Sequence, residues 1–349
     1  MRIASYNVEW FGNLFGPTGR MLADGEWSAR YEVTRADQLG ALGIVFTALD
    51  ADAVMVIEAP DQNRRRTTVG QLETFAAHFG LRARRAVLGF PSETEQEIAL
   101  LYDPDVIEAV HDPMGAPTGK KGAPAGPAGA PRFDGAFRYD LDIDAAPEII
   151  TFSKPPLELA VTTREGFAFR MIGVHAKSKA PHGARNAHEA RRIAIENRRK
   201  QLAQCVWLRA RVDEILDLGA PLVVLGDFND GPGLDEYEKL FGRSGLEIVL
   251  GLGAGSDPAR ALIEPHAGLA LSSKLAAQPT SARFWLADQH RYLSALLDYV
   301  MLSPDLAAKG ARWRIWHPLD DPGCWRVPEL RDALLAASDH FPVSVDLQI

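Results

Sequence analysis

The sequence predicts an α/β (α+β) fold in which helices flank mixed β-sheets, and three observations predict it. Short apolar runs with β-branched residues are interspersed with amphipathic helical stretches along all 349 residues. Several predicted strands follow one another through short turns, as the strands of hairpins do. These hairpins outnumber the crossover connections, so we expect the sheets to be mixed rather than purely parallel.

The first half of the chain contains strands and helices in succession. Leu39, Leu42, Phe46 and Leu49 recur at helical spacing and form one apolar helix face, and Glu58 directly follows a continuous apolar strand. The predicted elements are a strand at residues 3–8, a helix at 30–49, a strand at 53–57, a helix at 69–79, a strand at 86–88, and a pair of strands, 98–102 and 106–110, joined by the turn Asp103-Pro104-Asp105.

The second half contains the longest predicted helix. Its core stripe is made by Leu202, Cys205, Leu208, Val212 and Ile215. The predicted elements are a hairpin of 157–163 and 167–175, the long helix at 187–218, a strand at 222–226, a short helix at 234–241, a strand at 296–302, a surface strand at 311–315, a helix at 328–337 and a final strand at 342–347.

Residues 112–131 consist almost entirely of Gly, Ala and Pro around Lys120-Lys121. Such a composition buries too little apolar surface to fix itself, so we expect a mobile surface loop. A linker between two domains would show the same composition. Because the strand pattern continues beyond the loop, we favour an insertion within a single domain that covers residues 1–349.

Composition excludes some classes of protein. The net charge of −8 and the pI of about 5.6 argue against a protein that coats nucleic acid over its whole surface, although a local basic groove stays compatible with them. Only two cysteines, Cys205 and Cys324, are present, so no disulfide framework is expected. No stretch approaches the length of a membrane span, and strand-like residues follow Met1-Arg2 directly. We therefore expect a cytoplasmic protein without a membrane-spanning segment, and no obligate protein partner is evident.

The stretch from Pro221 to Asp230 reads as a strand buried on both faces that ends in Gly226 and polar residues. Asp227 and Asn229 lie two residues apart, so on an extended chain both side chains would converge on one point beyond the strand. A carboxylate and an amide placed in this way suit metal-assisted attack on phosphorus. An Asx turn would explain the same residues without any function.

Further polar residues stand where apolar strands stop or begin. Catalytic groups collect at such ends because the strands are rigid and their ends face solvent. Asn7 could equally be a turn former, and His175 a satisfied core histidine. A carboxylate at Asp298, within an apolar strand, would be costly to bury without a partner. The full set is Asn7, Glu58, His175, Asp227, Asn229, Asp298, Asp339 and His340.

These residues stand in six ordered motifs that resemble those of the endonuclease/exonuclease/phosphatase superfamily, whose fold is that of deoxyribonuclease I. The resemblance spans nearly the whole chain and implies a four-layer sandwich, with two mixed sheets face to face and helices outside. It also implies a divalent-metal-dependent phosphoesterase. The motifs are Ser5-Tyr6-Asn7-Val8, the strand ending in Glu58, Val174-His175-Ala176-Lys177-Ser178, Gly226-Asp227-Phe228-Asn229, Leu297-Asp298-Tyr299 and Ser338-Asp339-His340.

The resemblance implies a metal site made of oxygen ligands. Glu58 would ligate Mg²⁺ or Mn²⁺, with Asn7 beside it and Asp339 in the same metal region. Asn7 would also be placed to contact the substrate. Hard oxygen ligands together with retained waters are what Mg²⁺ accepts.

It also implies the catalytic groups. His340, oriented by Asp298, would act on the attacking water or the scissile phosphate. Asp227 would align or deprotonate that water, while Asn229 would contact the substrate and steady the pentavalent phosphorane. His175 would donate a hydrogen bond or a proton to the leaving oxygen. Direct in-line attack by water needs no covalent intermediate.

The chain departs from the family pattern at three positions. Ile57 stands where many members have Gln before the metal-binding Glu, and Leu297 stands where Arg is common. Lys154 replaces the Arg of an Arg-Pro strand start, which keeps the charge but loses the bidentate fork. None of these removes a catalytic group, but they weaken any assignment to the abasic-site endonucleases.

Basic and aromatic residues near the motifs are candidates for substrate contact. Lys177 and Lys179 directly follow His175 and are the strongest of them. The basic residues farther along, up to Arg198-Arg199-Lys200, would form either a phosphate-binding ridge or a solvated helix face. Candidate residues also include a basic run after Glu58 and three aromatics that could stack on bases or lie in the core: Arg64-Arg65-Arg66, Trp10, Phe11 and Trp285.

Three functions stay open on the sequence. A phosphodiesterase or nuclease is favoured, with DNA, RNA or nucleotides among the candidate phosphoester substrates. The alternative is a hydrolase of small-molecule or lipid phosphates, such as sugar, inositol or phospholipid head groups. A catalytically silent binding module is the third, and the presence of every expected acid and imidazole argues against it.

Overall fold

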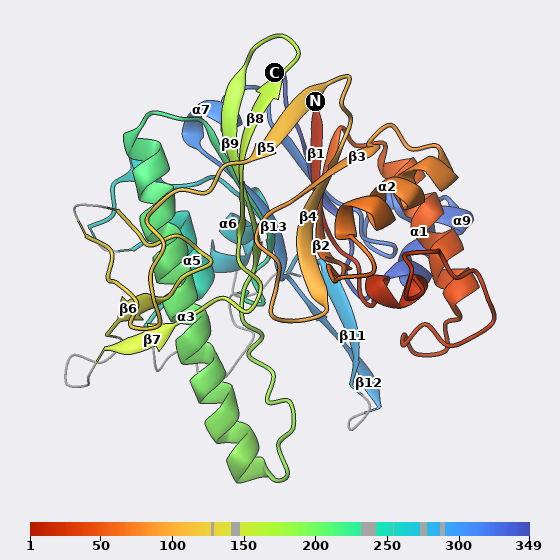
Figure 1. Cartoon of the computed structure of the whole chain (residues 1–349), viewed down its shortest axis with the longest axis horizontal. Coiled ribbons are helices and arrows are strands. Elements are labelled where there is room, and N and C mark those ends of the chain that lie inside the picture. The colour runs from red at the N-terminus through yellow and green to blue at the C-terminus, as the bar shows by residue number, and fades with distance from the viewer. Residues whose placement is uncertain (127–128, 141–146, 232–241, 254, 273–277, 287–289) are drawn as a thin grey trace.

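A computed structural model describes the chain except for residues 127–128, 141–146, 232–241, 254, 273–277 and 287–289. Two mixed β-sheets lie face to face at its centre, and helices cover both outer faces (Figure 1). The four-layer sandwich expected from the motifs is therefore the observed architecture. The organisation as a single domain stays a prediction.

The first sheet has six strands in the order β14-β15-β1-β2-β4-β3. β1 and β2 are parallel, whereas the other neighbours are antiparallel, so the sheet is mixed. Its strands are β1 (Arg2–Asn7), β2 (Ala53–Pro60), β3 (Arg85–Leu88), β4 (Gln96–Tyr102), β14 (Arg312–Ile315) and β15 (Val343–Asp346).

The second sheet has five strands in the order β13-β10-β9-β8-β5, and β9 and β10 form its parallel pair. Two further hairpins, β6–β7 and β11–β12, stand outside the main sheets. These strands are β5 (Ile107–His111), β6 (Phe137–Tyr139), β7 (Glu148–Ile150), β8 (Leu157–Thr163), β9 (Ala168–His175), β10 (Leu222–Asp227), β11 (Ala282–Leu286), β12 (Arg291–Ala295) and β13 (Asp298–Leu302).

Helices cover each sheet on the side that faces away from the other sheet. The first sheet is covered by α1 (Arg35–Leu49), α2 (Thr68–Phe79), α8 (Pro322–Trp325) and α9 (Pro328–Ala337). The second is covered by α3 (Ala187–Asp217), α5 (Gly245–Leu250) and α6 (Pro265–Ser272). The remaining short helices are η1 (Phe11–Leu14), η2 (Pro258–Arg260) and α7 (Pro304–Ala307). Because most central strands are covered on both faces, they read in the sequence as continuous apolar runs.

The layer between the two sheets is a packed apolar core to which both sheets contribute side chains. At Gly173 on β9 the sheets approach so closely that an added Cβ would lie 2.4 Å from Sδ of Met55 on β2. Ile98 on β4 would also be within 3.0 Å of that Cβ. Gly173 therefore leaves the space that the Met55 side chain fills, and this packing sets the local separation of the sheets.

The turn Asp103-Pro104-Asp105 does not close a hairpin, contrary to the prediction. β4 lies between β2 and β3 and has no free edge for another strand. The chain instead leaves the first sheet at this turn and enters the second as β5 beside β8. The hairpin of β8 and β9 is as predicted, with the Thr163 amide bonded to the Phe167 carbonyl.

Several predicted boundaries shift. α1 begins at Arg35 rather than residue 30, because the Thr34 side chain caps it by accepting from the Asp37 amide at 3.2 Å. Asp298 is the first residue of β13 and does not lie in the middle of a strand. The long helix, α3, is confirmed almost to the residue and begins after the cap Asn186. The helix predicted at 234–241 lies outside the described residues.

The Gly/Ala/Pro-rich loop is anchored at its C-terminal end, contrary to the expectation that nothing fixes it. Arg211 of α3 is fully buried and donates to the carbonyl oxygens of Ala130 and Pro131 at 2.7 and 3.1 Å. The same guanidinium bonds Glu158 of β8 at 2.7 Å and Glu214 at 2.8 Å. One buried cation thus joins the loop, α3 and the second sheet.

Replacing Arg211 by Met should reduce the free energy of unfolding by about 3–5 kcal/mol, because it leaves the Glu158 carboxylate buried without its partner. Urea unfolding followed by circular dichroism measures the loss. Lys200→Met on the same helix is the matched control, since the Lys200–Glu196 pair is about half exposed and contributes less than about 1 kcal/mol. Equal losses in the two variants would contradict this role of Arg211.

Candidate active site

The polar residues predicted at strand ends meet at one edge of the sandwich, where strands of both sheets end. β1 of the first sheet ends at Asn7, while β9 and β10 of the second end at His175 and Asp227. Asp227 lies beside His175 in the parallel register and opposite Asp298 in the antiparallel one. A hydrogen bond of 2.9 Å from Asn7 Nδ2 to Asp227 Oδ2 joins the two sheets at this edge.

Gly226 allows β10 to approach β9 just before Asp227. Its φ of 141° and the position of Val174 leave no room for a side chain, since a Cβ would lie 1.9 Å from the Val174 carbonyl oxygen. Glycine is thus required at position 226, directly before the Asp227 carboxylate.

Glu58 owes its position to a β-bulge. The register of β2 against β4 shifts between Ile57 and Ala59, and Glu58 between them has a left-handed φ of 60°. A non-glycine residue in this conformation is strained, and such strain gathers at functional sites. The Gln96 side chain on β4 donates a hydrogen bond to the Glu58 carboxylate. It supplies, from another strand, the contact that Ile57 cannot make.

Asp227 is held by amides on both of its oxygens. Its Oδ1 accepts from the Asn229 backbone at 2.7 Å, and its Oδ2 accepts from the Asn7 and Asn229 side chains at 2.9 and 3.3 Å. The Asx turn considered in the sequence is therefore formed, and it fixes the carboxylate. Burial raises the pKa of Asp227 to about 7, despite the opposing charge of His340 and these hydrogen bonds.

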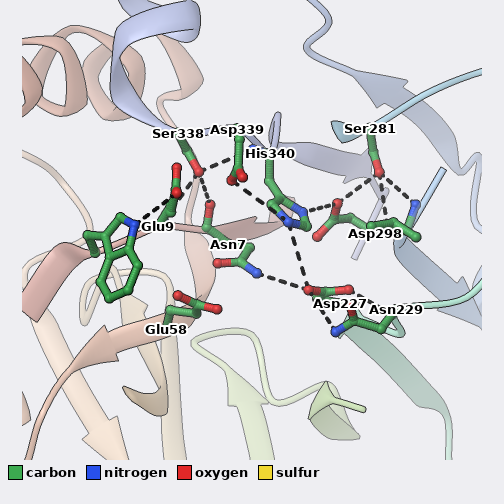
Figure 2. Close-up of polar contacts among 12 residues, drawn as sticks. Asn7, Glu9, Glu58, Asp227, Asn229, Ser281, Asp298, Ser338, Asp339 and His340 are labelled. Atoms are coloured by element: carbon green, nitrogen blue, oxygen red, sulfur yellow. Dashed lines mark hydrogen bonds and ion pairs between the residues drawn. The ribbon is translucent and has the colours of Figure 1, made fainter. Parts of the chain in front are cut away.

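His340 forms an ion pair with Asp298. Nδ1 of the imidazole lies 2.8 Å from Asp298 Oδ2, and Ser281 Oγ donates to the same oxygen at 2.8 Å (Figure 2). Burial disfavours the charged imidazole, but the charge and hydrogen bond of Asp298 raise the pKa of His340 well above its usual value. Its Nε2 lies 3.9 Å from both Asp227 and Asp339. The partner predicted for the Asp298 carboxylate is thus the histidine.

The pKa of His175 is shifted in the direction opposite to that of His340. Burial, reinforced by the positive charges of Lys154 and His340, holds the pKa of His175 well below its usual value. Its Nε2 lies 3.6 Å from Asp227 Oδ2 and 3.9 Å from Glu58 Oε1. This imidazole is neutral near pH 7, and it faces the same space as His340.

Glu58, Asn7 and Asp339 lie on one side of this space, beside His340 and Asp227 (Figure 2). Asn7 Oδ1 and Asp339 Oδ1 are buried and have no hydrogen-bond partner among the described residues. Burial raises the pKa of Glu58, although the positive charges of Lys154 and His340 oppose the shift. Unsatisfied hard oxygens beside a buried carboxylate fit a divalent cation such as Mg²⁺ or Mn²⁺.

A second group of metal-ligating side chains overlaps the first. Asp227, Asp298 and His340 place ligand atoms within 4.8 Å of one another. Hydrogen bonds already engage both oxygens of Asp227 and join Asp298 to His340. Asp298 Oδ1, like the Oδ1 atoms of Asn7 and Asp339, has no hydrogen-bond partner among the described residues.

Three residues that sequence reasoning did not assign also line the site. Lys154 is largely buried and has a lowered pKa through burial, which the charges of Glu58 and Asp227 oppose. Gln96 bonds Glu58, and Glu9 bonds Trp10 Nε1 at 2.9 Å and forms an ion pair with Arg30. Lys154 carried a signal in its Lys-Pro-Pro motif. Gln96 carried none, because only the pairing of β2 with β4 brings it to Glu58.

The basic residues after His175 differ in burial and in the groups that they contact. Lys177 and Lys179 both line the cavity, but the Lys179 ammonium bonds the buried Asp230 at 2.5 Å. Farther along α3, Arg198 is buried, Arg199 pairs with Glu148 at 2.6 Å and Lys200 with Glu196 at 2.9 Å. Neither a phosphate-binding ridge nor a fully solvated face describes Arg198 to Lys200. Of the aromatics, Phe11 is core, Trp10 lines the cavity and Trp285 stacks on Tyr31.

All of the predicted strand-end residues except Asp298 line one cavity of about 730 Å³. The rest of the lining includes two groups of residues that differ in chemistry. One group consists of the polar side chains of Thr94, Gln96, Ser153, Lys154 and Lys177, and the other is apolar and comes from the β11–β12 hairpin and the residues that follow it. Sequence reasoning did not identify this apolar group, although Phe284-x-Leu286 and Leu293-x-Ala295 show the alternation of a strand.

A four-layer α/β sandwich with carboxylates, amides and two histidines at one edge is the arrangement that the motifs implied for the phosphoester hydrolases. The chain belongs to the Endonuclease/Exonuclease/phosphatase family, whose model matches residues 4–340. Comparison with curated proteins found no match.

Solved structures that are similar to this chain have low sequence identity to it. TDP2 from Caenorhabditis elegans is 12% identical, with a TM-score of 0.51 over 99% of this chain and 73% of that chain. An AP endonuclease from Archaeoglobus fulgidus is 12% identical, with a TM-score of 0.49 over 100% of both chains. The mannosyl-6-phosphatase Bt3783 of Bacteroides thetaiotaomicron is 15% identical, with a TM-score of 0.46 over 99% of both chains. Within the described residues, no helix is long and apolar enough to cross a membrane.

Replacing Gly226 by Ala should lower the free energy of unfolding by more than about 2 kcal/mol, because the new methyl group would overlap the Val174 carbonyl. Thermal and urea unfolding measure the loss. Gly40→Ala on the exposed face of α1 is the control, since no atom lies within 4 Å of its added Cβ. That variant should gain about 0.5–1 kcal/mol from helix propensity. A Gly226→Ala protein as stable as the parent would show that β10 and β9 are not held this closely.

Proposed function

We propose that this chain is a divalent-metal-dependent phosphodiesterase that acts by in-line attack of water on phosphorus. The observation that carries the proposal is the convergence of a neutral imidazole, an ion-paired imidazole and a buried carboxylate beside unsatisfied oxygens. These groups are His175, His340, Asp227, Asn7 and Asp339. Buried oxygens without a hydrogen-bond partner, placed beside carboxylates, are available to coordinate an ion.

Glu58, Asn7 and Asp339 would hold the ion on one side of the scissile phosphate. When bound, Mg²⁺ or Mn²⁺ supplies charge neutralisation at the phosphoryl oxygens. The Glu58 carboxylate and the Asp339 carboxylate provide the negative charge, and the Asn7 amide oxygen provides a neutral ligand. Gln96 keeps Glu58 in place by its hydrogen bond.

Asp227 is suited to accept a proton from the attacking water. A pKa of about 7 keeps a useful fraction of the carboxyl ionised at neutral pH and makes it a stronger base than an ordinary aspartate. Asn7 and Asn229 hold it by both oxygens, so its orientation toward the phosphate is fixed.

The two histidines divide the remaining work. His340, kept positively charged by Asp298, places a donor next to the phosphate oxygens and stabilises the charge that grows there. His175 is neutral, and its Nε2 is the nitrogen that faces Asp227 and Glu58. It can donate a hydrogen bond to the reacting phosphate without adding a second positive charge.

Lys154 and Lys177 line the cavity and would bind the non-reacting oxygens of the substrate. Lys179 also lines the cavity, but its ammonium group is paired with Asp230. Its role would be to hold the segment after His175 in place. The substrate therefore meets two cations and the apolar hairpin.

The reaction is tested by hydrolysis of bis(p-nitrophenyl) phosphate and p-nitrophenyl phosphate with Mg²⁺, with Mn²⁺ and with EDTA. We expect metal-dependent cleavage of the diester above that of the monoester. His340→Ala and Asp227→Ala should each lower the diester rate at least about 100-fold, because a charged donor or a base is lost. His78→Ala, on α2 outside the cavity, should leave the rate unchanged, and circular dichroism checks that all variants fold. Monoester cleavage alone would instead favour a small-molecule phosphate hydrolase.

The metal site has its own test, which needs no turnover. Glu58→Gln removes one carboxylate ligand and should weaken Mn²⁺ binding, measured by isothermal titration calorimetry, by at least about 10-fold. Glu108→Gln, on an exposed position of β5, should not change it. Unaltered Mn²⁺ binding in Glu58→Gln would contradict this metal site and favour the overlapping group of Asp227, Asp298 and His340 instead.

A further inference from the structure

One face of the β11–β12 hairpin is mostly apolar, with Arg291 opposite Leu286 as its charged member, and the other face is polar and aromatic. Arg291 is not among the residues that line the cavity. Phe284 of β11 is opposite Leu293 of β12, and because side chains alternate along a strand, Leu286 and Ala295 lie on the same face. All four line the active-site cavity, together with Leu297 directly after the hairpin. The opposite face carries Arg283, Trp285, Tyr292 and Ser294. We call the five cavity-lining residues the hairpin wall.

The hairpin wall is attached directly to the catalytic groups. The Phe284 ring packs edge-on against the His340 imidazole, with ring centroids 5.3 Å apart. The backbone on either side is hydrogen-bonded to the same segment, from the Arg283 amide to the Asp339 carbonyl at 2.7 Å and from the Phe341 amide to the Ser281 carbonyl at 2.6 Å. Ser281 in turn bonds Asp298. The wall therefore begins at the catalytic histidine and is held in place.

The chemistry of the wall is purely apolar. Phe284, Leu286, Leu293, Ala295 and Leu297 offer no side-chain donor or acceptor to a ligand. Phe284, Leu286 and Leu293 are only partly buried, so their apolar surface faces the cavity. The same cavity is also lined by the cations Lys154 and Lys177. A ligand that fills it would thus combine a polar part with an apolar part.

We propose that the hairpin wall binds a hydrocarbon chain, an alkyl or acyl substituent of the phosphoester whose phosphate sits at the catalytic groups. This inference rests on the proposed function for the position of the phosphate. A nucleobase is a poorer occupant, because its ring donors and acceptors would lose water without gaining partners on these side chains. A hydrocarbon chain has no such groups and gains by leaving water.

The test compares binding of three phosphates in the presence of Mn²⁺ by calorimetry: inorganic phosphate, hexyl phosphate and thymidine 5′-monophosphate. Each methylene buried on the wall increases affinity about fourfold. Hexyl phosphate should therefore bind at least about 10-fold more tightly than inorganic phosphate, and more tightly than the nucleotide.

Leu293→Asn should remove most of this advantage of the hexyl chain while leaving the affinity for inorganic phosphate unchanged. Ser294→Asn is the matched control, since it places the same side chain on the next residue but on the other face of the hairpin. Leu286→Asn, farther from the catalytic groups, serves as the second variant should Leu293→Asn unfold. Thermal melts identify any variant that does.

Equal affinities for hexyl phosphate and inorganic phosphate would overturn the proposal, as would tighter binding of the nucleotide or equal effects of Leu293→Asn and Ser294→Asn. These outcomes are separate from failure of the proposed function. A wall that binds hexyl phosphate in a protein without diesterase activity would keep this inference and refute the other. Diesterase activity without a preference for the hexyl chain would do the reverse.

Discussion

The hydrogen bond from Asn7 to Asp227 marks the constraint on which the rest of the structure depends, because it joins the strand ends of two sheets that pack face to face. The first sheet carries Asn7 and Glu58, and the second carries His175, Asp227 and Asp298. His340 stands just before β15 of the first sheet, yet its ion pair is with the first residue of β13 in the second. Neither sheet alone holds a complete set of groups. The apolar layer between them is what assembles the site.

Two histidines a few ångströms from the same aspartate differ in charge near pH 7, one positive and one neutral, and their surroundings explain the difference. His340 has a carboxylate at 2.8 Å on Nδ1, whereas Nδ1 of His175 has no hydrogen-bond partner among the described residues. Burial acts on both in the same direction. The short contact with Asp298, together with the negative charges of Asp227 and Asp339, therefore distinguishes the cationic imidazole from the neutral one.

The sequence was sufficient for what depends on local pattern: α3, the β8–β9 hairpin, the four-layer class through its motifs, and the positions of the polar residues at strand ends. The sequence-based prediction failed where a strand or side chain pairs with residues that are far away in the sequence. Residues 98–110 look like a hairpin, but both edges of β4 are already paired. The burial of Arg198, the role of Gln96 and the apolar part of the cavity lining likewise depend on which elements lie side by side, which no local pattern encodes.

Gly173 and Met55 do not line the candidate active-site cavity, and yet their contact affects how far apart β9 and β2 stand. A larger side chain at the glycine would push β9 away from β2, and His175 and Glu58 belong to those two strands. A shortened Met55 would let them move closer. In this fold the thickness of the apolar layer sets the distance between the polar groups on the two sheets. Substitutions within that layer can therefore change the geometry of the candidate site without altering a charge or a polar contact.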